Sequence, residues 1–271
     1  MILGIDVSRW QQKVDWELLK SKEVKFAFIK ATQGNYLVDP MLKTHLTNAR
    51  KNGMIVGLYH WCDPMVSTDG QARFFLEATK GLDYSFAVAD MEQNWSDWAE
   101  WRNKKITKII PAQKISDNAR NILEYWKKHI DKTLIVYTRA SFINYYAAIA
   151  SSWLPNYHLW LAHYVTKINK ANITWDAFKN YIPRDGGPSL PRNCTKWTFW
   201  QFTGGRFILQ GVDTSIDLNL FNGDLDALIK LAGGKKIEIP QQENPAEIPE
   251  LTLEERVARL EKLAKENGWQ L

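Results

Sequence analysis

The chain has 271 residues, of which 45% are hydrophobic, which is enough for a sizeable core and excludes general disorder. Its two cysteines, Cys62 and Cys194, exclude a disulfide framework and have no metal-binding spacing, so we expect two free thiols and no metal. The net charge is +5, and because residues 235–271 carry six Lys/Arg and eight Glu, the remainder carries +7. A basic body favours anionic polymers. Without a Lys/Arg-rich run, an anionic cell wall or a generic solvated surface explains the charge as well as a nucleic acid does, and we expect no nucleic-acid partner.

Short apolar runs alternate with helical patterns along the first 150 residues. In chain order they predict a strand over 2–7, a helix over 15–22, a strand over 25–31, a helix over 40–52, a strand over 54–61, a helix over 68–79, a strand over 84–90, a helix over 116–129, a strand over 133–137 and a helix over 141–150. We expect Asp39 and Ser141 to be the N-caps of the helices that follow them, with Gly53 just after the end of the first.

Helices are fewer in the next part of the chain. Three further strands are predicted over 158–162, 197–202 and 211–218, and a closing helix over 220–231. Strands that alternate with helices are joined by crossover connections and are therefore parallel. Eight such strands in about 230 residues predict an α/β fold, a barrel with fewer helices in its second half. Functional side chains of such barrels gather at the carboxyl ends of the strands.

Composition changes at residue 233, where we place the end of a barrel domain over 1–233. Residues 234–251 contain three prolines and several Glu, which is typical of an extended linker. At the other end, the chain opens Met1-Ile2-Leu3-Gly4-Ile5-Asp6, without a basic segment or a long apolar stretch. We therefore expect no secretory signal and no membrane insertion.

Residues 252–271 predict a final amphipathic helix. Thr252 and Glu255 form a capping box, and from Leu253 onward apolar residues recur on one face. A lone helix of this length is marginal in water, so it needs a partner. We expect self-association into a homo-oligomer through residues 252–267, with docking onto the barrel as the alternative.

Two carboxylates stand two residues apart at the end of the predicted strand over 84–90, in Asp90-Met91-Glu92. Residues i and i+2 of a strand face the same side, so both side chains project together. Like charges at this spacing raise one pKa, which leaves one proton donor and one anion beside a single substrate bond, as glycosidic cleavage requires. Asp6 and Asp217 also fall near strand ends, so we expect all four acids to meet. The alternative is a strand end whose acids merely face solvent.

Eight short motifs follow one another along residues 1–230. They are Gly4-Ile5-Asp6-Val7-Ser8-Arg9-Trp10-Gln11, Phe28-Ile29-Lys30-Ala31-Thr32-Gln33-Gly34, Gly57-Leu58-Tyr59-His60, Ala89-Asp90-Met91-Glu92, Leu134-Ile135-Val136-Tyr137-Thr138, Leu159-Trp160-Leu161-Ala162, Trp200-Gln201-Phe202 and Ile216-Asp217-Leu218-Asn219. In this order they resemble the family 25 glycoside hydrolases, the phage and bacterial N-acetylmuramidases. The chain departs from that family at Gln33, where the family usually carries Glu, and Asp213 competes with Asp217 for the last acid.

The resemblance implies a modified (β/α) barrel, no cofactor, and an acidic site made of Asp6, Asp90, Glu92 and Asp217. It also implies a substrate cleft of aromatic and polar side chains. The expected cleft residues are Tyr59, Tyr137, Trp160 and Gln201, with His60 and Trp61 as further substrate contacts.

The function predicted from this resemblance is hydrolysis of peptidoglycan at the β-1,4 bond between N-acetylmuramic acid and N-acetylglucosamine. Glu92 is the expected general acid. Asp90 either attacks the anomeric carbon or orients the 2-acetamido group of the substrate to do so, and we favour the second role. Without a secretory signal, such an enzyme is expected to be made in a bacterial cytoplasm. It then reaches the wall after release, as a phage or prophage lysin or with the virion.

Two other functions are compatible with parts of the sequence. The first is a non-catalytic module that binds cell-wall glycans, against which the presence of all four acids argues. The second is a chitinase-like hydrolase, since some chitinases also use an Asp-x-Glu pair. Phe86 and Val88 stand where those enzymes have further alternating aspartates, which argues against this alternative.

Overall fold

An eight-stranded sheet closes into a barrel in the computed structural model, which describes residues 1–165, 172–205 and 207–234. The barrel strands are β1 (Ile2–Val7), β2 (Phe26–Gln33), β4 (Ile55–Trp61), β5 (Phe86–Asp90), β6 (Thr133–Thr138), β7 (His158–Ala162), β8 (Phe199–Gln201) and β9 (Asp217–Phe221). The sheet closes because β1 pairs with both β2 and β9. A short extra strand, β3 (Leu37–Val38), pairs antiparallel with β2. The predicted barrel is therefore confirmed.

The sequence predicted that all barrel strands are parallel, and this prediction was wrong for one strand. The barrel strands β1, β2 and β4 to β8 run parallel to one another, but β9 runs antiparallel to both of its neighbours, β1 and β8. The predicted strand over 211–218 was also misplaced, since β9 begins only at Asp217. Gly211 has a φ of +93°, and the buried Val212 and Ile216 belong to the loop before the strand.

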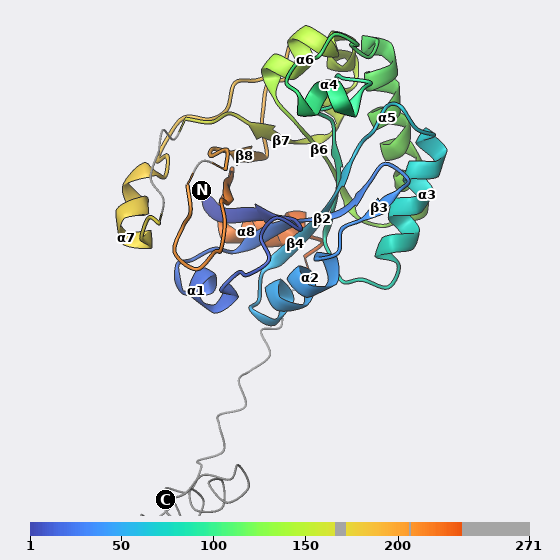
Figure 1. Cartoon of the computed structure of the whole chain (residues 1–271). Coiled ribbons are helices and arrows are strands. Elements are labelled where there is room, and N and C mark those ends of the chain that lie inside the picture. The colour runs from blue at the N-terminus through green and yellow to red at the C-terminus, as the bar shows by residue number, and fades with distance from the viewer. Residues whose placement is uncertain (166–171, 206, 235–271) are drawn as a thin grey trace, which may run out of the picture. The chain divides into compact units, whose positions relative to one another are not determined.

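Helices surround the outside of the barrel, mainly along its first two thirds (Figure 1). They are α1 (Trp16–Ser21), α2 (Leu42–Lys51), α3 (Thr68–Thr79), α4 (Trp98–Arg102), α5 (Ala112–His129), α6 (Ala140–Tyr146), α7 (Trp175–Phe178) and α8 (Leu225–Leu231). Short 3-10 helices follow α6 at Ala148–Ser152 and Leu154–Asn156, and α7 at Lys179–Tyr181. The expectation of fewer helices in the second half is confirmed. Among the described residues, none of the helices has the length and hydropathy required to cross a membrane.

Four predicted helix starts were wrong. The α5 helix begins at Ala112, before the predicted start at residue 116. The other three differ for local reasons. The α2 helix begins at Leu42, and Asp39 accepts hydrogen bonds from the backbone N–H groups of Arg9 (3.1 Å) and Met41 (3.0 Å) instead of capping it. The α6 helix begins at Ala140, so Ser141 lies inside it. The closing helix α8 is shorter than predicted because residues 220–221 belong to β9, and Asp224 is its N-cap.

Aromatic side chains fill the inside of the barrel. The Phe28 ring stacks on Trp160 with centroids 4.1 Å apart, and the edge of Phe199 packs against Phe28 at 5.0 Å. Gly57 is required beside them, because a Cβ at this position would overlap the ring of Phe28. Inward positions alternate along each strand, so the apolar layer at one level gives way to polar side chains at the next. The rings thus form the floor of the cavity described below.

The predicted linker and the predicted helix over 252–271, with its association through 252–267, lie outside the described residues apart from Gly234. The described barrel and its helices lie within residues 1–234.

Candidate active site

A cavity of about 230 Å³ opens at the end of the barrel where the parallel strands finish. Side chains from most barrel strands line it, and nine of the ten residues that the sequence singled out are among them. These are Asp6, Tyr59, Trp61, Asp90, Glu92, Tyr137, Trp160, Gln201 and Asp217. The four acids therefore share one cavity, which is the arrangement on which the predicted chemistry depends.

Strand direction brings Asp6 and Asp217 together. Asp6 lies near the carboxyl end of β1, whereas Asp217 is the first residue of β9, and the two are paired in register. Because β9 is antiparallel, its amino end lies at the same mouth of the barrel as the carboxyl ends of the other strands. Asp217 therefore reaches the cavity although it does not follow a strand.

Asp90 and Glu92 both reach the cavity from the carboxyl end of β5. Asp90 is the last residue of β5, and Glu92 lies two residues beyond the end of that strand. Asp90 is only 3% exposed, and its Oδ1 atom has no hydrogen-bond partner among the described residues. Glu92 is partly exposed in the cavity. One carboxyl thus lies deep in the cavity while the other faces its opening.

Gln201 connects the acids to the aromatic wall. Its Oε1 accepts hydrogen bonds from the hydroxyls of Tyr137 (2.7 Å) and Tyr164 (3.1 Å). This fixes the amide so that Nε2 donates to Oδ2 of Asp6 at 2.9 Å and of Asp217 at 3.4 Å. An ionised carboxylate is the better acceptor, so these bonds favour charge on the two acids.

Burial nevertheless dominates the protonation of this half of the cluster. It raises the pKa of Asp6 to about 6, against hydrogen bonds from Asn219 and Gln201 that lower it. The pKa of Asp217 is raised well above its usual range, first by burial and then by the negative charge of Asp6. Both shifts favour the protonated, neutral form of these two acids.

Burial is also the main cause of the shifts in the other half. It raises the pKa of Asp90 well above its usual range, and the neighbouring Glu92 carboxylate adds to that effect. The pKa of Glu92 is raised by burial, while the positive charges of Arg139 and Lys30 oppose the shift. The sequence had attributed the raised pKa of Glu92 to neighbouring anions, but loss of solvent is the larger cause.

Lys30 is a cavity residue that the sequence reading missed. Its Nζ lies 4.8 Å from the centroid of the Trp61 ring and donates to Oε1 of Gln33 at 2.9 Å. Burial lowers the pKa of Lys30, and the negative charge of Asp90 opposes that shift. The alternation Phe26, Phe28, Lys30 along β2 was the signal that could have placed it inside the barrel.

Other cavity residues also came from outside the predicted set. They are Val7, Ser8, Trp10, Gln11 and Tyr164. Trp10 is 70% exposed, so its ring faces the opening, whereas the predicted Tyr137 and Trp160 are almost fully buried and form the floor. The ring of Trp10 could be found only as part of the first motif, since nothing in its spacing marks it.

His60 does not reach the cavity. It alternates with Tyr59 and Trp61 on β4 and therefore points to the opposite face of the sheet. Its Nδ1 is 2.8 Å from Oγ1 of Thr32 and its Nε2 is 3.2 Å from Oε1 of Gln71. Burial lowers its pKa to about 3, so the ring is neutral and belongs to the core. The predicted contact between His60 and substrate has no support in this position.

No group of three or more His, Cys, Asp or Glu side chains in the described part of the chain is arranged to hold a metal ion. The cavity instead combines two pairs of carboxyl groups with one buried amine and exposed aromatic rings. This set can supply a proton, an anion and flat apolar surfaces to one ligand.

Comparisons with known proteins show the family and the fold. Residues 5–210 match the family model for glycosyl hydrolases family 25. An uncharacterized protein of Escherichia coli K12, YegX, is 32% identical over 241 residues, which cover 87% of this chain and 75% of YegX. Lysozyme M1 of Streptomyces globisporus is 30% identical over 239 residues, which cover 85% of this chain and 71% of that protein.

Two solved structures have the same fold. The bacterial lysozyme of Streptomyces coelicolor superposes with a TM-score of 0.68 at 26% identity, covering 86% of this chain and 97% of the lysozyme. A family 25 glycosyl hydrolase of Bacillus anthracis superposes with a TM-score of 0.64 at 26% identity, covering 86% of this chain and 94% of that protein.

Proposed function

The chain belongs to glycosyl hydrolases family 25 and is a glycoside hydrolase, and from this premise we propose that it cleaves the β-1,4 bond between N-acetylmuramic acid and N-acetylglucosamine in peptidoglycan. One observation supports the proposal above all others. Four carboxyl groups, from Asp6, Asp90, Glu92 and Asp217, line a single cavity with few cations. In such a cluster protons are retained at neutral pH, and glycosidic cleavage needs one of them.

Glu92 is the general acid in this proposal. The raised pKa values of Asp90 and Glu92 favour retention of a proton by the pair. Glu92 is the partner that is partly exposed in the cavity, so a proton on it is available to the bridging oxygen of a bound glycan. Protonation of that oxygen lets the leaving sugar depart as a neutral alcohol while positive charge develops at the anomeric carbon.

Asp90 stabilises that developing charge through the substrate. Asp90 lines the cavity, and its carboxylate is the acceptor for the N–H of the 2-acetamido group. Held in this way, the acetamido oxygen attacks the anomeric carbon and forms a bicyclic intermediate, which water then opens. Direct attack by Asp90 is the other route, and it requires the carboxylate to be ionised at that moment.

The exposed rings at the opening support sugar binding. Trp10 and Trp61 line the cavity, and Lys30 holds the Trp61 ring from within. Flat apolar rings beside a few fixed polar groups are typical of sites that bind carbohydrate-sized ligands. Asp6 and Asp217, joined through Gln201, position the remaining polar groups of the sugar.

Product analysis tests the function directly. Purified peptidoglycan and chitin are each incubated with the protein and with Glu92→Gln, and new reducing ends are identified. We expect reducing N-acetylmuramic acid from peptidoglycan with the unchanged protein alone. Anhydro ends would indicate a lytic transglycosylase, ends from chitin a chitinase-like enzyme, and binding without new ends a glycan-binding module.

We also propose that the enzyme reaches the wall after release from the cell that makes it.

A further inference from the structure

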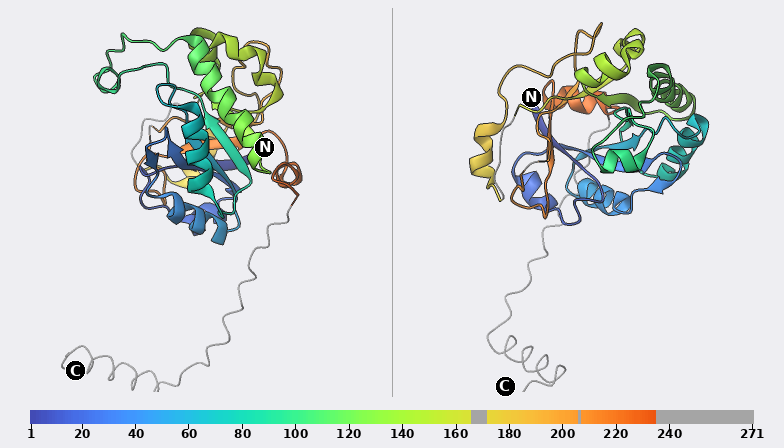
Figure 2. Two further views of the ribbon diagram at one scale, coloured as in Figure 1. Left: turned by 90° about the vertical axis from the view of Figure 1, so that its right-hand side faces the viewer. Right: turned by 45° about the horizontal axis from the view of Figure 1, so that its top comes forward.

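Residues 94–110 form an arm that leaves the barrel directly after the catalytic pair and returns at the start of α5. The two sides of the arm are joined at its base, where the N–H of Ile110 donates to the carbonyl of Asn94 at 2.8 Å and the N–H of Ser96 to that of Lys108 at 3.0 Å. The segment, with α4 at its tip, extends well away from the body of the barrel (Figure 2, left, in green). The arm therefore extends the molecule beyond the wall of the cavity.

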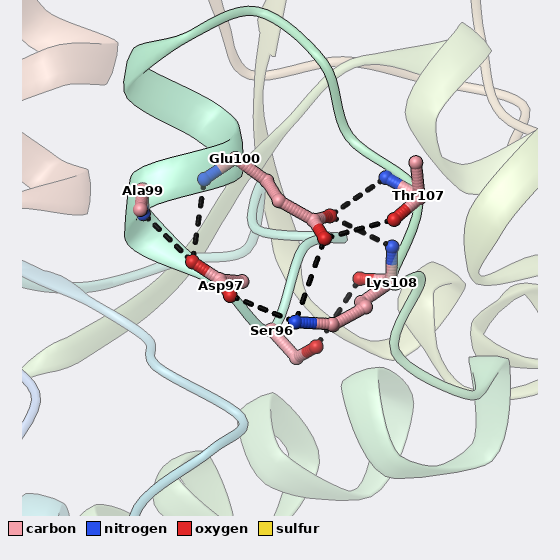
Figure 3. A network of polar contacts seen from close by, with 6 residues as sticks. All are labelled: Ser96, Asp97, Ala99, Glu100, Thr107 and Lys108. Carbon is pink, nitrogen blue, oxygen red and sulfur yellow. Dashed lines mark hydrogen bonds and ion pairs between the residues drawn. The ribbon is translucent and has the colours of Figure 1, made fainter.

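A network of polar contacts gives the arm a fixed shape (Figure 3). Glu100 accepts hydrogen bonds from the N–H and hydroxyl of Thr107 at 2.7 and 2.8 Å and from the N–H of Lys108 at 3.0 Å. Asp97 caps α4 and receives Lys108 Nζ at 2.9 Å. These hydrogen bonds lower the pKa of both acids, so both are charged and both are used within the arm.

The arm is continuous with the cavity wall through tryptophan side chains. Trp95, at its base, is 6% exposed and packs against Trp61, with centroids 6.2 Å apart. Trp61 lines the cavity, and its Nε1 donates to Gln93 at 3.1 Å. On its other side Trp95 stacks on Trp101, with centroids 5.4 Å apart and 21° between the planes. Three rings thus lead from the cavity to the outer surface of the arm.

The outer surface of the arm is cationic and apolar. Arg102, Lys104 and Lys105 are exposed and have no ion-pair partner within the described parts of the chain. The arm's two acids are already engaged, so nothing on it neutralises these charges. Trp101 is 42% exposed beside them, which leaves part of its ring open to solvent.

We propose that this arm is a second binding surface for peptidoglycan, outside the cavity in which the bond is cleaved. Its three unpaired cations meet the carboxylates of the peptides that peptidoglycan carries, and the open ring of Trp101 meets a sugar face. A long strand in the cavity must continue past its wall, and the Trp61–Trp95–Trp101 path puts the arm next to the cavity opening. This inference rests on the proposed function and deepens it, because it assigns recognition of the anionic polymer to a separate part of the molecule.

A surface of this kind acts on the polymer and not on a short glycan. Each exposed charge contact is weak, but three contacts on a tethered strand combine, so the affinity for intact wall rises by roughly tenfold. The effect falls as salt is added, because exposed charges are screened. A tetrasaccharide that fits within the cavity gains nothing from the arm.

The test compares Arg102→Gln/Lys104→Gln/Lys105→Gln with the unchanged protein on purified sacculi and on a peptide-free tetrasaccharide of the same repeat. The matched control is Lys51→Gln/Lys127→Gln/Lys128→Gln, which removes three exposed charges at the other end of the barrel, where α2 and α5 finish. We expect the arm variant alone to need roughly tenfold more sacculi for half-maximal rate at low salt. Its kcat and its tetrasaccharide kinetics should equal those of the control.

Other outcomes overturn the inference. If the two triple variants needed the same amount of sacculi for half-maximal rate, the arm would have no part in polymer binding, and the proposed function would still stand. An equal loss on the tetrasaccharide would show that the arm shapes the cavity. If the arm variant instead loses binding only to vesicles of phosphatidylglycerol, the surface serves a lipid. If the unchanged protein neither binds nor cleaves sacculi, the proposed function and this inference fall together.

Discussion

Asp6 and Asp217 are register partners on two antiparallel strands, so their carboxyl groups face each other across the β1–β9 ladder. Side chains in such a pair lie close together, and two like charges in this position destabilise the sheet. Gln201 donates to both carboxylates and reduces the cost without removing it. The acidic site therefore opposes folding at the pH where it is charged.

Asp6→Asn should increase the free energy of unfolding at neutral pH, because it removes a buried carboxyl group that is costly to ionise. The pKa of Asp6 is about 6 in the folded protein and near 3.8 when unfolded. Its contribution to stability is therefore fully present below pH 4 and is lost as pH rises through 6, which amounts to roughly 3 kcal/mol at most. Urea unfolding at pH 4 and pH 7 should show Asp6→Asn gaining on the unchanged protein at pH 7. A difference that is the same at both pH values would contradict this account.

Gln201→Leu should raise the pKa of Asp6 above its present value, because an apolar side chain gives no hydrogen bond to the ionised carboxylate. Carbon-13 NMR of labelled aspartate side chains measures this directly. Tyr164→Phe is the matched control, since it removes a bond to the same amide but leaves both of its donors on the acids. A larger shift in the control than in Gln201→Leu would mean that the amide does not set the protonation of Asp6.

Glu92→Gln should reduce peptidoglycan cleavage by about two to four orders of magnitude, since the amide has no acidic proton to give to the leaving oxygen. Binding to sacculi should persist, because the side chain keeps its size. Release of reducing ends and cosedimentation with sacculi measure the two properties separately. Lysis at the unchanged rate would remove Glu92 from the role of proton donor.

His60→Ala should affect stability and not substrate binding. The ring is fully buried, contacts Phe75 and Trp126, and bonds to side chains behind the sheet, so its loss should cost about 2–4 kcal/mol of unfolding free energy. Half-saturation by sacculi should not change. His129→Ala, at an exposed helix end, is the control and should lose far less stability. If His60→Ala instead needed more sacculi for half-maximal rate while its unfolding free energy was unchanged, His60 would be a substrate contact as first predicted.

If the predicted helix over 252–271 associates through residues 252–267, a chain that ends at residue 233 should form particles with fewer chains than the full chain does. Sedimentation equilibrium of the two proteins measures the mass of each particle relative to its chain. The truncation keeps the barrel and all four acids, so it should still cleave peptide-free glycan. The same number of chains per particle in both proteins would end the prediction of self-association.

The barrel could be predicted because its signals are local. Apolar runs and helical periods placed β1, α3 and β7 correctly, since each element buries one face with a regular period. The direction of β9 could not be predicted from its residues, because β-strands of either direction have the same alternation. Asp39 looked like a helix cap, but its bond to the backbone after β1 joins segments 30 residues apart, which no local pattern reveals.

The same division applies to the site. The acids could be named from the end of an apolar run and from the family resemblance, and they lie in one cavity. Lys30 was overlooked because a lysine in a strand is usually assumed to face solvent. The fixed shape of the arm could not be predicted, since it comes from hydrogen bonds that Glu100 accepts from groups seven and eight residues further along the chain.

The stacked rings inside the barrel also limit how a substrate can enter. With Phe28 and Trp160 occupying the lumen, no sugar chain can thread downward, and a glycan has to lie across the mouth with both of its ends outside the protein. A bond in the middle of a long strand is then as accessible as a bond at its tip. The plugged lumen is thus compatible with scission inside a polymer as well as at its tip.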